Sequence, residues 1–215
     1  MFLLKLSSEK KNVGIYPQVI EFANDHHVTE LIDLRNIPFT NAESAVKLRP
    51  IQLRKGAKRT DFLSVVMAGF PDQLICSKKI IEIFSRYRGQ PHTTSELEVR
   101  HKGDVLTYYL VNFLGDVSVN PVDFSKSRAY YAGGERAGDE IADVSWERFR
   151  TNRYLRMINL PIKDQVLQSY SYFGFPIFPK FILADDLAED LIAANVTGVR
   201  FIYFTETADI RTELR

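Results

Sequence analysis

The chain has 215 residues, of which 45% are hydrophobic and 12% aromatic, and its Lys and Arg residues almost balance its Asp and Glu residues at a formal net charge of +1. This composition is typical of a globular domain with a substantial core, and it excludes disorder along the whole chain. The near-zero charge argues against a dedicated nucleic-acid binder. The single cysteine, Cys76, excludes an intramolecular disulfide and a multi-cysteine zinc site.

The sequence has no stretch that is long and apolar enough to cross a membrane as a helix. Its first residues, MFLLKLSSEK, do not form the charged-then-apolar pattern of a signal peptide. We therefore expect a cytoplasmic protein with no membrane partner.

The N-terminal third is the most irregular part of the sequence. Residues 2–6 and 28–34 are predicted as short strands, and residues 16–22 as a short helical or extended piece. A basic run follows at residues 47–59, and its cations are Lys47, Arg49, Arg54, Lys55, Lys58 and Arg59. Such a run suits contact with phosphates or with an acidic protein, although a solvated strand–turn–strand also explains it.

The middle of the sequence predicts a helix followed by a β-hairpin. The helix covers residues 78–88, where Ser77 is a favourable N-cap and Gly89 a favourable end. Its apolar residues at helical spacing are Ile80, Ile81, Phe84 and Tyr87. Residues 96–101 then alternate charged with apolar side chains, and residues 105–114 are apolar on both faces. The short glycine-containing link between these two stretches predicts the hairpin.

Residues 116–124 are predicted as a further strand, and residues 125–143 as a surface loop. This loop contains AGGERAG at residues 132–138, whose glycines suggest a phosphate-binding loop. The stretch lacks both the Gly-Lys-Ser/Thr and the G-x-G-x-x-G patterns, so a mobile, glycine-rich tip is the preferred interpretation.

The C-terminal third combines strands with one helix. Strands are predicted at residues 154–160, 165–173, 178–184 and 199–204, and the second of these is alternatively helical. The helix covers residues 186–195, with Asp186 as its N-cap and Glu189 three residues later. Few helices among many strands, without regular βαβ alternation, predict an α+β fold with a mixed or mainly antiparallel sheet and a few packed helices.

No group of residues forms a convincing catalytic or metal site. The adjacent His26 and His27 lack the i, i+4 spacing of a helical metal pair, and His92 and His101 are isolated. Cys76 would be a nucleophile only if the fold supplied a partner histidine, and a small buried hydrophobe is the simpler interpretation. We therefore expect no enzyme activity, no metal and no cofactor.

Three segments together resemble a known family. They are SKKIIEIF at residues 77–84, YYLVNF at 108–113 with VDFS at 122–125, and FILADDLA at 181–188 with VTGVRF at 196–201. In order and content they are similar to the immunity-protein family of bacterial polymorphic toxin systems called immunity family eleven, a former domain of unknown function. The resemblance covers residues 71–215 and leaves residues 1–70 outside it.

The resemblance implies a cytoplasmic protein that binds and neutralises one cognate toxin protein and that has no catalytic residues. We accordingly expect a single α+β domain over residues 1–215, with an N-terminal subdomain at 1–70 and an immunity-like region at 71–215. The alternative is a nucleic-acid-binding domain that uses the basic run at residues 47–59.

Two regions are predicted to contact the partner, because tight protein interfaces concentrate their binding energy in aromatic and arginine side chains. The loop at residues 125–143 offers Arg128, Tyr130, Tyr131 and Arg136, and the basic run offers Arg49, Arg54 and Arg59. The loop is preferred, since Tyr130 and Tyr131 supply a large contact area at little cost in side-chain entropy.

Overall fold

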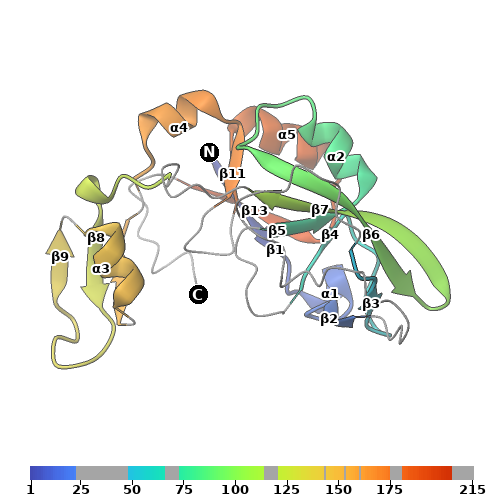
Figure 1. Cartoon of the computed structure of the whole chain (residues 1–215), viewed down its shortest axis with the longest axis horizontal. Helices are drawn as coiled ribbons and strands as arrows, with labels where there is room; N and C mark the ends of the chain where they lie inside the picture. The colour runs from blue at the N-terminus through green and yellow to red at the C-terminus, as the bar shows by residue number, and fades with distance from the viewer. Residues whose placement is uncertain are drawn as a thin grey trace. The chain divides into compact units, whose positions relative to one another are not determined.

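A computed structural model describes residues 1–22, 48–65, 73–113, 121–142, 144–152, 154–159, 161–174 and 181–204 of the chain (Figure 1). It has three sheets, mostly antiparallel, together with short helices, which confirms the predicted α+β fold class. The chain divides into two compact units, described separately below. Unit 1 comprises Met1–Val117 and Tyr170–Tyr203, and unit 2 comprises Ser118–Ser169 and Phe204–Arg215.

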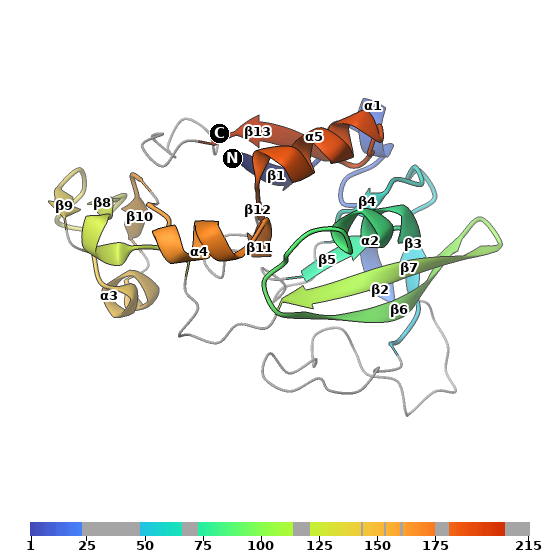
Figure 2. The ribbon, with the colours of Figure 1, turned by 90° about the horizontal axis from the view of Figure 1, so that it is seen from above.

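Unit 1 contains two sheets. The six-stranded sheet has the order β2-β3-β6-β7-β5-β4 and is antiparallel except between β3 and β6 (Figure 2). Its strands are β2 Val19–Phe22, β3 Ile51–Leu53, β4 Phe62–Leu63, β5 Gln73–Cys76, β6 His92–His101 and β7 Asp104–Phe113. The four-stranded sheet is antiparallel throughout, in the order β11-β12-β1-β13. Its strands are β1 Phe2–Leu6, β11 Tyr172–Gly174, β12 Phe181–Leu183 and β13 Val199–Tyr203.

The predicted hairpin is confirmed as β6 and β7. Lys102 and Gly103 form its two-residue turn with φ values of 53° and 89°, and the register places His101 opposite Asp104. Two-residue turns with positive φ match the twist of the strands that they connect, so this Lys-Gly link sets the register of the whole hairpin.

One hydrophobic core of unit 1 lies where both sheets meet α2 (Lys78–Phe84) and α5 (Asp185–Ala193), two neighbouring helices in Figure 1. Its buried residues include Leu4, Phe62, Ile80, Phe84, Val111, Phe113, Tyr172, Phe181, Leu183, Leu187 and Leu191. A second core covers the other face of the six-stranded sheet and includes Ile51, Leu53, Leu97, Val99 and Leu110. Successive side chains of β5 show the division, because Leu74 and Cys76 belong to the first core and Ile75 to the second.

Both predicted helices of unit 1 exist, but their ends differ from the prediction. α2 is shorter than predicted, and its N-cap Ser77 donates its hydroxyl to Asp61 Oδ1 (2.9 Å) instead of accepting from the helix. The N-cap of α5 is Ala184, so Asp186 lies in the first turn and the predicted capping role of Asp186 is wrong. A carboxylate in the first turn still stabilises the helix by facing the positive end of its dipole.

Unit 2 contains a three-stranded antiparallel sheet in the order β10-β8-β9, and part of it occupies residues predicted as a loop. Its elements are η3 Phe124–Lys126, β8 Arg128–Tyr131, β9 Glu140–Ala142, α3 Trp146–Thr151, β10 Leu155–Met157 and α4 Asp164–Ser169. The prediction of a surface loop at residues 125–143 is therefore wrong, because β8 and β9 pair as a hairpin. Strands this short do not show a recognisable alternation.

Some predictions fall outside the described residues. These are the strand at residues 28–34, most of the strand at residues 116–124, the pair His26 and His27, Lys47 and the subdomain boundary at residue 70. The strands on either side of that boundary, β4 and β5, pair with each other in one sheet. In the part of the chain that the structure describes, no helix is long and apolar enough to cross a membrane.

Candidate protein-binding surface

The sheet of unit 2 has one exposed and one buried face. The register places Tyr130 opposite Glu140 of β9 and Arg156 of β10, and Arg128 opposite Ala142. Directly opposed residues lie on the same face of a sheet, so these side chains share one face. The other face carries the buried side chains of Ala129, Tyr131, Leu155 and Met157. We call Arg128, Tyr130, Glu140 and Arg156 the exposed face of unit 2.

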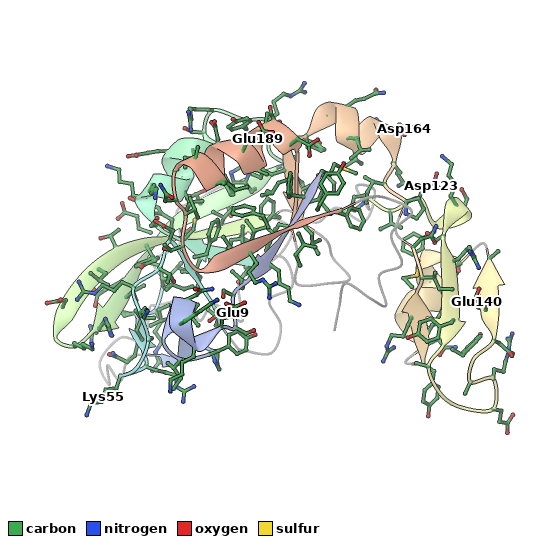
Figure 3. All side chains as sticks on the ribbon, turned by 180° about the vertical axis from the view of Figure 1, so that it is seen from behind. Glu9, Lys55, Asp123, Glu140, Asp164 and Glu189 are labelled. Atoms are coloured by element: carbon green, nitrogen blue, oxygen red, sulfur yellow. The ribbon has the colours of Figure 1, made fainter. Side chains whose placement is uncertain are left out.

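Two arginines flank the half-buried Tyr130 on this face. Arg128 forms an ion pair with Glu140 (2.6 Å between Nη2 and Oε2), and Glu140 is labelled on β9 in Figure 3. Arg156 donates from Nη1 to the carbonyl of its neighbour Leu155 (2.9 Å). An exposed ion pair adds little stability, but it restricts where the Arg128 guanidinium lies. The face therefore combines one aromatic residue with two neighbouring arginines and a carboxylate.

Tyr131 lies on the buried face of the sheet and contacts side chains that stabilise the hairpin. Its side chain is only 7% exposed, and its hydroxyl accepts hydrogen bonds from Arg148 Nη2 (3.1 Å) and Arg136 Nη1 (3.4 Å). The Arg136 guanidinium also lies 4.5 Å from the centre of the Tyr131 ring and pairs with Asp139 (3.0 Å). Tyr130 and Tyr131 thus lie on opposite faces, and the structure divides the predicted group between contact with solvent and support of the hairpin.

The backbone conformation and packing of the turn between β8 and β9 explain its glycines. Gly134 and Gly138 have φ values of +81° and +94°, which L side chains rarely adopt. A Cβ atom at Gly133 would lie 3.1 Å from the ring of Tyr154, which covers this turn. The turn and the close aromatic contact account for these glycines without a phosphate ligand.

The arginines of the basic run belong to unit 1, whereas the exposed face belongs to unit 2. Arg49 is half-buried just before β3, and Arg54 follows β3 and donates from its backbone to Gln18 O (3.0 Å). Arg59 forms an ion pair with Asp104 and donates from Nε to His101 Nδ1 (3.4 Å). The two predicted regions therefore belong to different units.

The candidate nucleophile Cys76 belongs to the core. Its side chain is 0% exposed, and burial raises the pKa of the thiol far above its usual value. A neutral buried thiol is a poor nucleophile. Within the described ranges, no three His, Cys, Asp or Glu side chains cluster as metal ligands.

The VTGVRF segment has a clear role in folding. Asp61 Oδ2 accepts from the backbone and the hydroxyl of Thr197 (2.9 and 2.8 Å), while Asp61 Oδ1 accepts from Ser77. Burial opposes the charge of Asp61, but the hydrogen bonds from Thr197 and Ser77 and the nearby Lys79 together hold its pKa below the usual value. The segment thus joins the end of α5 to β4 and α2 within unit 1.

Two residues of the exposed face were missed at the sequence level, namely Glu140 and Arg156. The signal available in the sequence was the alternation of apolar Leu155, charged Arg156 and apolar Met157 in a stretch predicted as extended. Glu140 had no such signal, because β9 has three residues and none of them is buried.

No protein-family model matches the chain, and a search of curated proteins finds no match. The candidate surface is therefore defined by its own geometry.

Proposed function

We propose that this protein is an immunity-type protein that binds one bacterial toxin domain through the exposed face of unit 2 and blocks it by direct contact. The observation that carries the proposal is the position of Tyr130 on the central strand β8, two residues after Arg128 and directly opposite Arg156 of β10. Tyrosine and arginine are the residues that most often dominate the binding energy of protein interfaces.

The short strands favour tight binding. Strand pairing fixes the backbone of β8 between β9 and β10, so Tyr130 loses little conformational freedom when a partner covers it. The charged residues around the ring suit a polar rim, which speeds the encounter with a partner of complementary charge. Tyr131 and Arg136, which are also predicted as contacts, interact with each other within the hairpin that carries this surface.

The proposal predicts a toxin domain encoded beside the gene of this protein, and that domain is the ligand of the test. Isothermal titration calorimetry measures complex formation, and the activity of the toxin is followed with and without the immunity-type protein. We expect a complex that suppresses the activity, and we expect Tyr130→Ala/Arg156→Ala to weaken it at least about tenfold, or about 1.4 kcal/mol.

The matched control is Tyr203→Ala, since Tyr203 is an aromatic residue of unit 1 that is 63% exposed. This variant is expected to bind like the unmodified protein. The absence of a neighbouring toxin gene, or a toxin domain that neither binds nor loses activity, would contradict the proposal.

A further inference from the structure

A second charged surface lies in unit 1, where α1 (Lys10–Val13) meets the turn after β3. The two segments are far apart in sequence but bonded to each other: Lys58 donates from its backbone to Val13 O (2.8 Å) and from Nζ to Lys11 O (2.6 Å). The backbone N–H of Arg54 donates to Gln18 O (3.0 Å) in the segment after α1. We call this group the basic surface, and it consists of Lys10, Lys11, Arg54, Lys55 and Lys58.

The charge of the basic surface is only partly compensated. Lys11 pairs with Glu9 (3.3 Å), a carboxylate that it shares with Arg200 (3.3 Å). Lys10 and Lys55 have no acidic partner among the described residues, and Lys55 projects outward from the ribbon in Figure 3. Clustered cations without counter-charges repel one another, so an anion bound there is favoured.

An exposed aromatic residue accompanies these cations. Tyr16 is 48% exposed, and its carbonyl lies 3.5 Å from the Arg54 guanidinium. Lysines that follow a phosphate backbone, combined with an aromatic ring on which a base stacks, are the usual means of binding single-stranded nucleic acid. Lysine is depleted in protein–protein interfaces, so a lysine-rich surface favours a nucleic acid over a protein partner.

We propose that the basic surface binds single-stranded nucleic acid through its phosphates, with Tyr16 stacking on a base. This inference does not depend on the function proposed for unit 2. The net charge of +1 does not oppose it, because that value averages this surface with the acidic first turn of α5, where Asp185 and Asp186 lie. Nucleic-acid binding depends on local charge rather than on the average.

The test measures the fluorescence anisotropy of a labelled single-stranded RNA of mixed sequence at salt concentrations from about 50 to 200 mM. We expect binding that weakens steeply with salt. The variant Lys10→Gln/Lys55→Gln is expected to weaken binding at least about tenfold at the lowest salt and to lower the log–log salt slope by about 1.4, as two lost phosphate contacts require. Tyr16→Leu is expected to weaken binding without changing the slope.

The matched control is Lys78→Gln, which removes an exposed lysine from α2 of the same unit. Circular dichroism establishes that each variant is folded. The proposal fails if the RNA does not bind at the lowest salt, or if the control loses as much affinity per lysine as the double variant. It also fails if polyglutamate competes as well as unlabelled RNA and Tyr16→Leu has no effect, because the surface would then suit an acidic protein.

Discussion

Gly198 occupies a position in unit 1 that a larger residue cannot take without displacing its neighbours. Its φ is +87°, and a Cβ atom there would lie 2.2 Å from Phe62 O and 2.8 Å from Thr60 Oγ1. The preceding Thr197 binds Asp61, so the backbone of this turn is held on both sides. The glycine of the VTGVRF segment is therefore required by packing.

Replacing Gly198 with alanine is expected to lower the free energy of unfolding by at least about 2 kcal/mol, because backbone strain and a steric clash add together. Gly103→Ala is the matched control, since Gly103 has φ +89° but a Cβ atom there would have no neighbour within 4 Å. Urea unfolding measures both variants. Equal losses would show that the clash at Gly198 relaxes at no cost.

His101 is a second residue whose surroundings have a measurable effect. It is 3% exposed, its Nδ1 accepts from Arg59, and its Nε2 has no partner among the described residues. Burial, with Lys102 and Arg59 nearby, lowers the pKa of His101 despite the opposing charge of Asp104. The folded state therefore holds His101 neutral more strongly than the unfolded chain does.

Because the pKa of His101 is lowered on folding, its contribution to stability is fully present above the usual histidine pKa of about 6.5 and is lost as the pH falls through its folded value. His101→Gln keeps an acceptor for Arg59 and cannot titrate. Urea unfolding at about pH 7.5 and about pH 5.0 is expected to show a smaller loss of stability for this variant than for the unmodified protein. The same loss in both proteins would refute this role of His101.

Among the elements, α2 shows how aromatic packing holds unit 1 together. Phe84 is 3% exposed and stacks on Tyr172 of β11, with ring centres 4.4 Å apart and planes inclined by 25°. It also lies beside Phe62 of β4 (6.5 Å between ring centres). One side chain of α2 thus contacts both sheets of the unit.

Truncating Phe84 to alanine is expected to cost about 3–5 kcal/mol of unfolding free energy, as for other buried aromatic residues. The control is Ile192→Ala on α5, because Ile192 is 49% exposed, and its loss is expected to stay below about 1 kcal/mol. Denaturant unfolding measures both. A loss of similar size at the two positions would mean that the face of α2 is misassigned.

The elements also differ in how far the sequence predicts them. The β6–β7 hairpin was predictable because its strands have ten residues each and its Lys-Gly turn has a known geometry. The β8–β9 hairpin was not, since its strands have four residues or fewer, and α4 was predicted only as the alternative to a strand. The exposed face of unit 2 was half predictable: Arg128 and Tyr130 stood out by residue type, but only strand pairing shows that Tyr131 turns away from them.

At the scale of the whole molecule, the two proposed surfaces belong to different units. The exposed face of unit 2 combines one aromatic ring with charges of both signs, whereas the basic surface of unit 1 combines cations that outnumber the nearby carboxylates. The composition of the chain averages these regions to near neutrality and so cannot distinguish them. The charge of a protein indicates the kind of partner that it binds only when the distribution of charged residues over the folded surface is known.

The most direct test of the central claim compares Tyr130 with Tyr131, neighbours in sequence that lie on opposite faces of one sheet. Calorimetry with the neighbouring toxin domain measures the affinity of Tyr130→Ala and of Tyr131→Phe, which keeps the ring beneath Arg136 and removes only the hydroxyl. We expect Tyr130→Ala to weaken binding at least about tenfold and Tyr131→Phe to change it less than about threefold. A Tyr130→Ala variant that binds the toxin as tightly as the unmodified protein would contradict the claim.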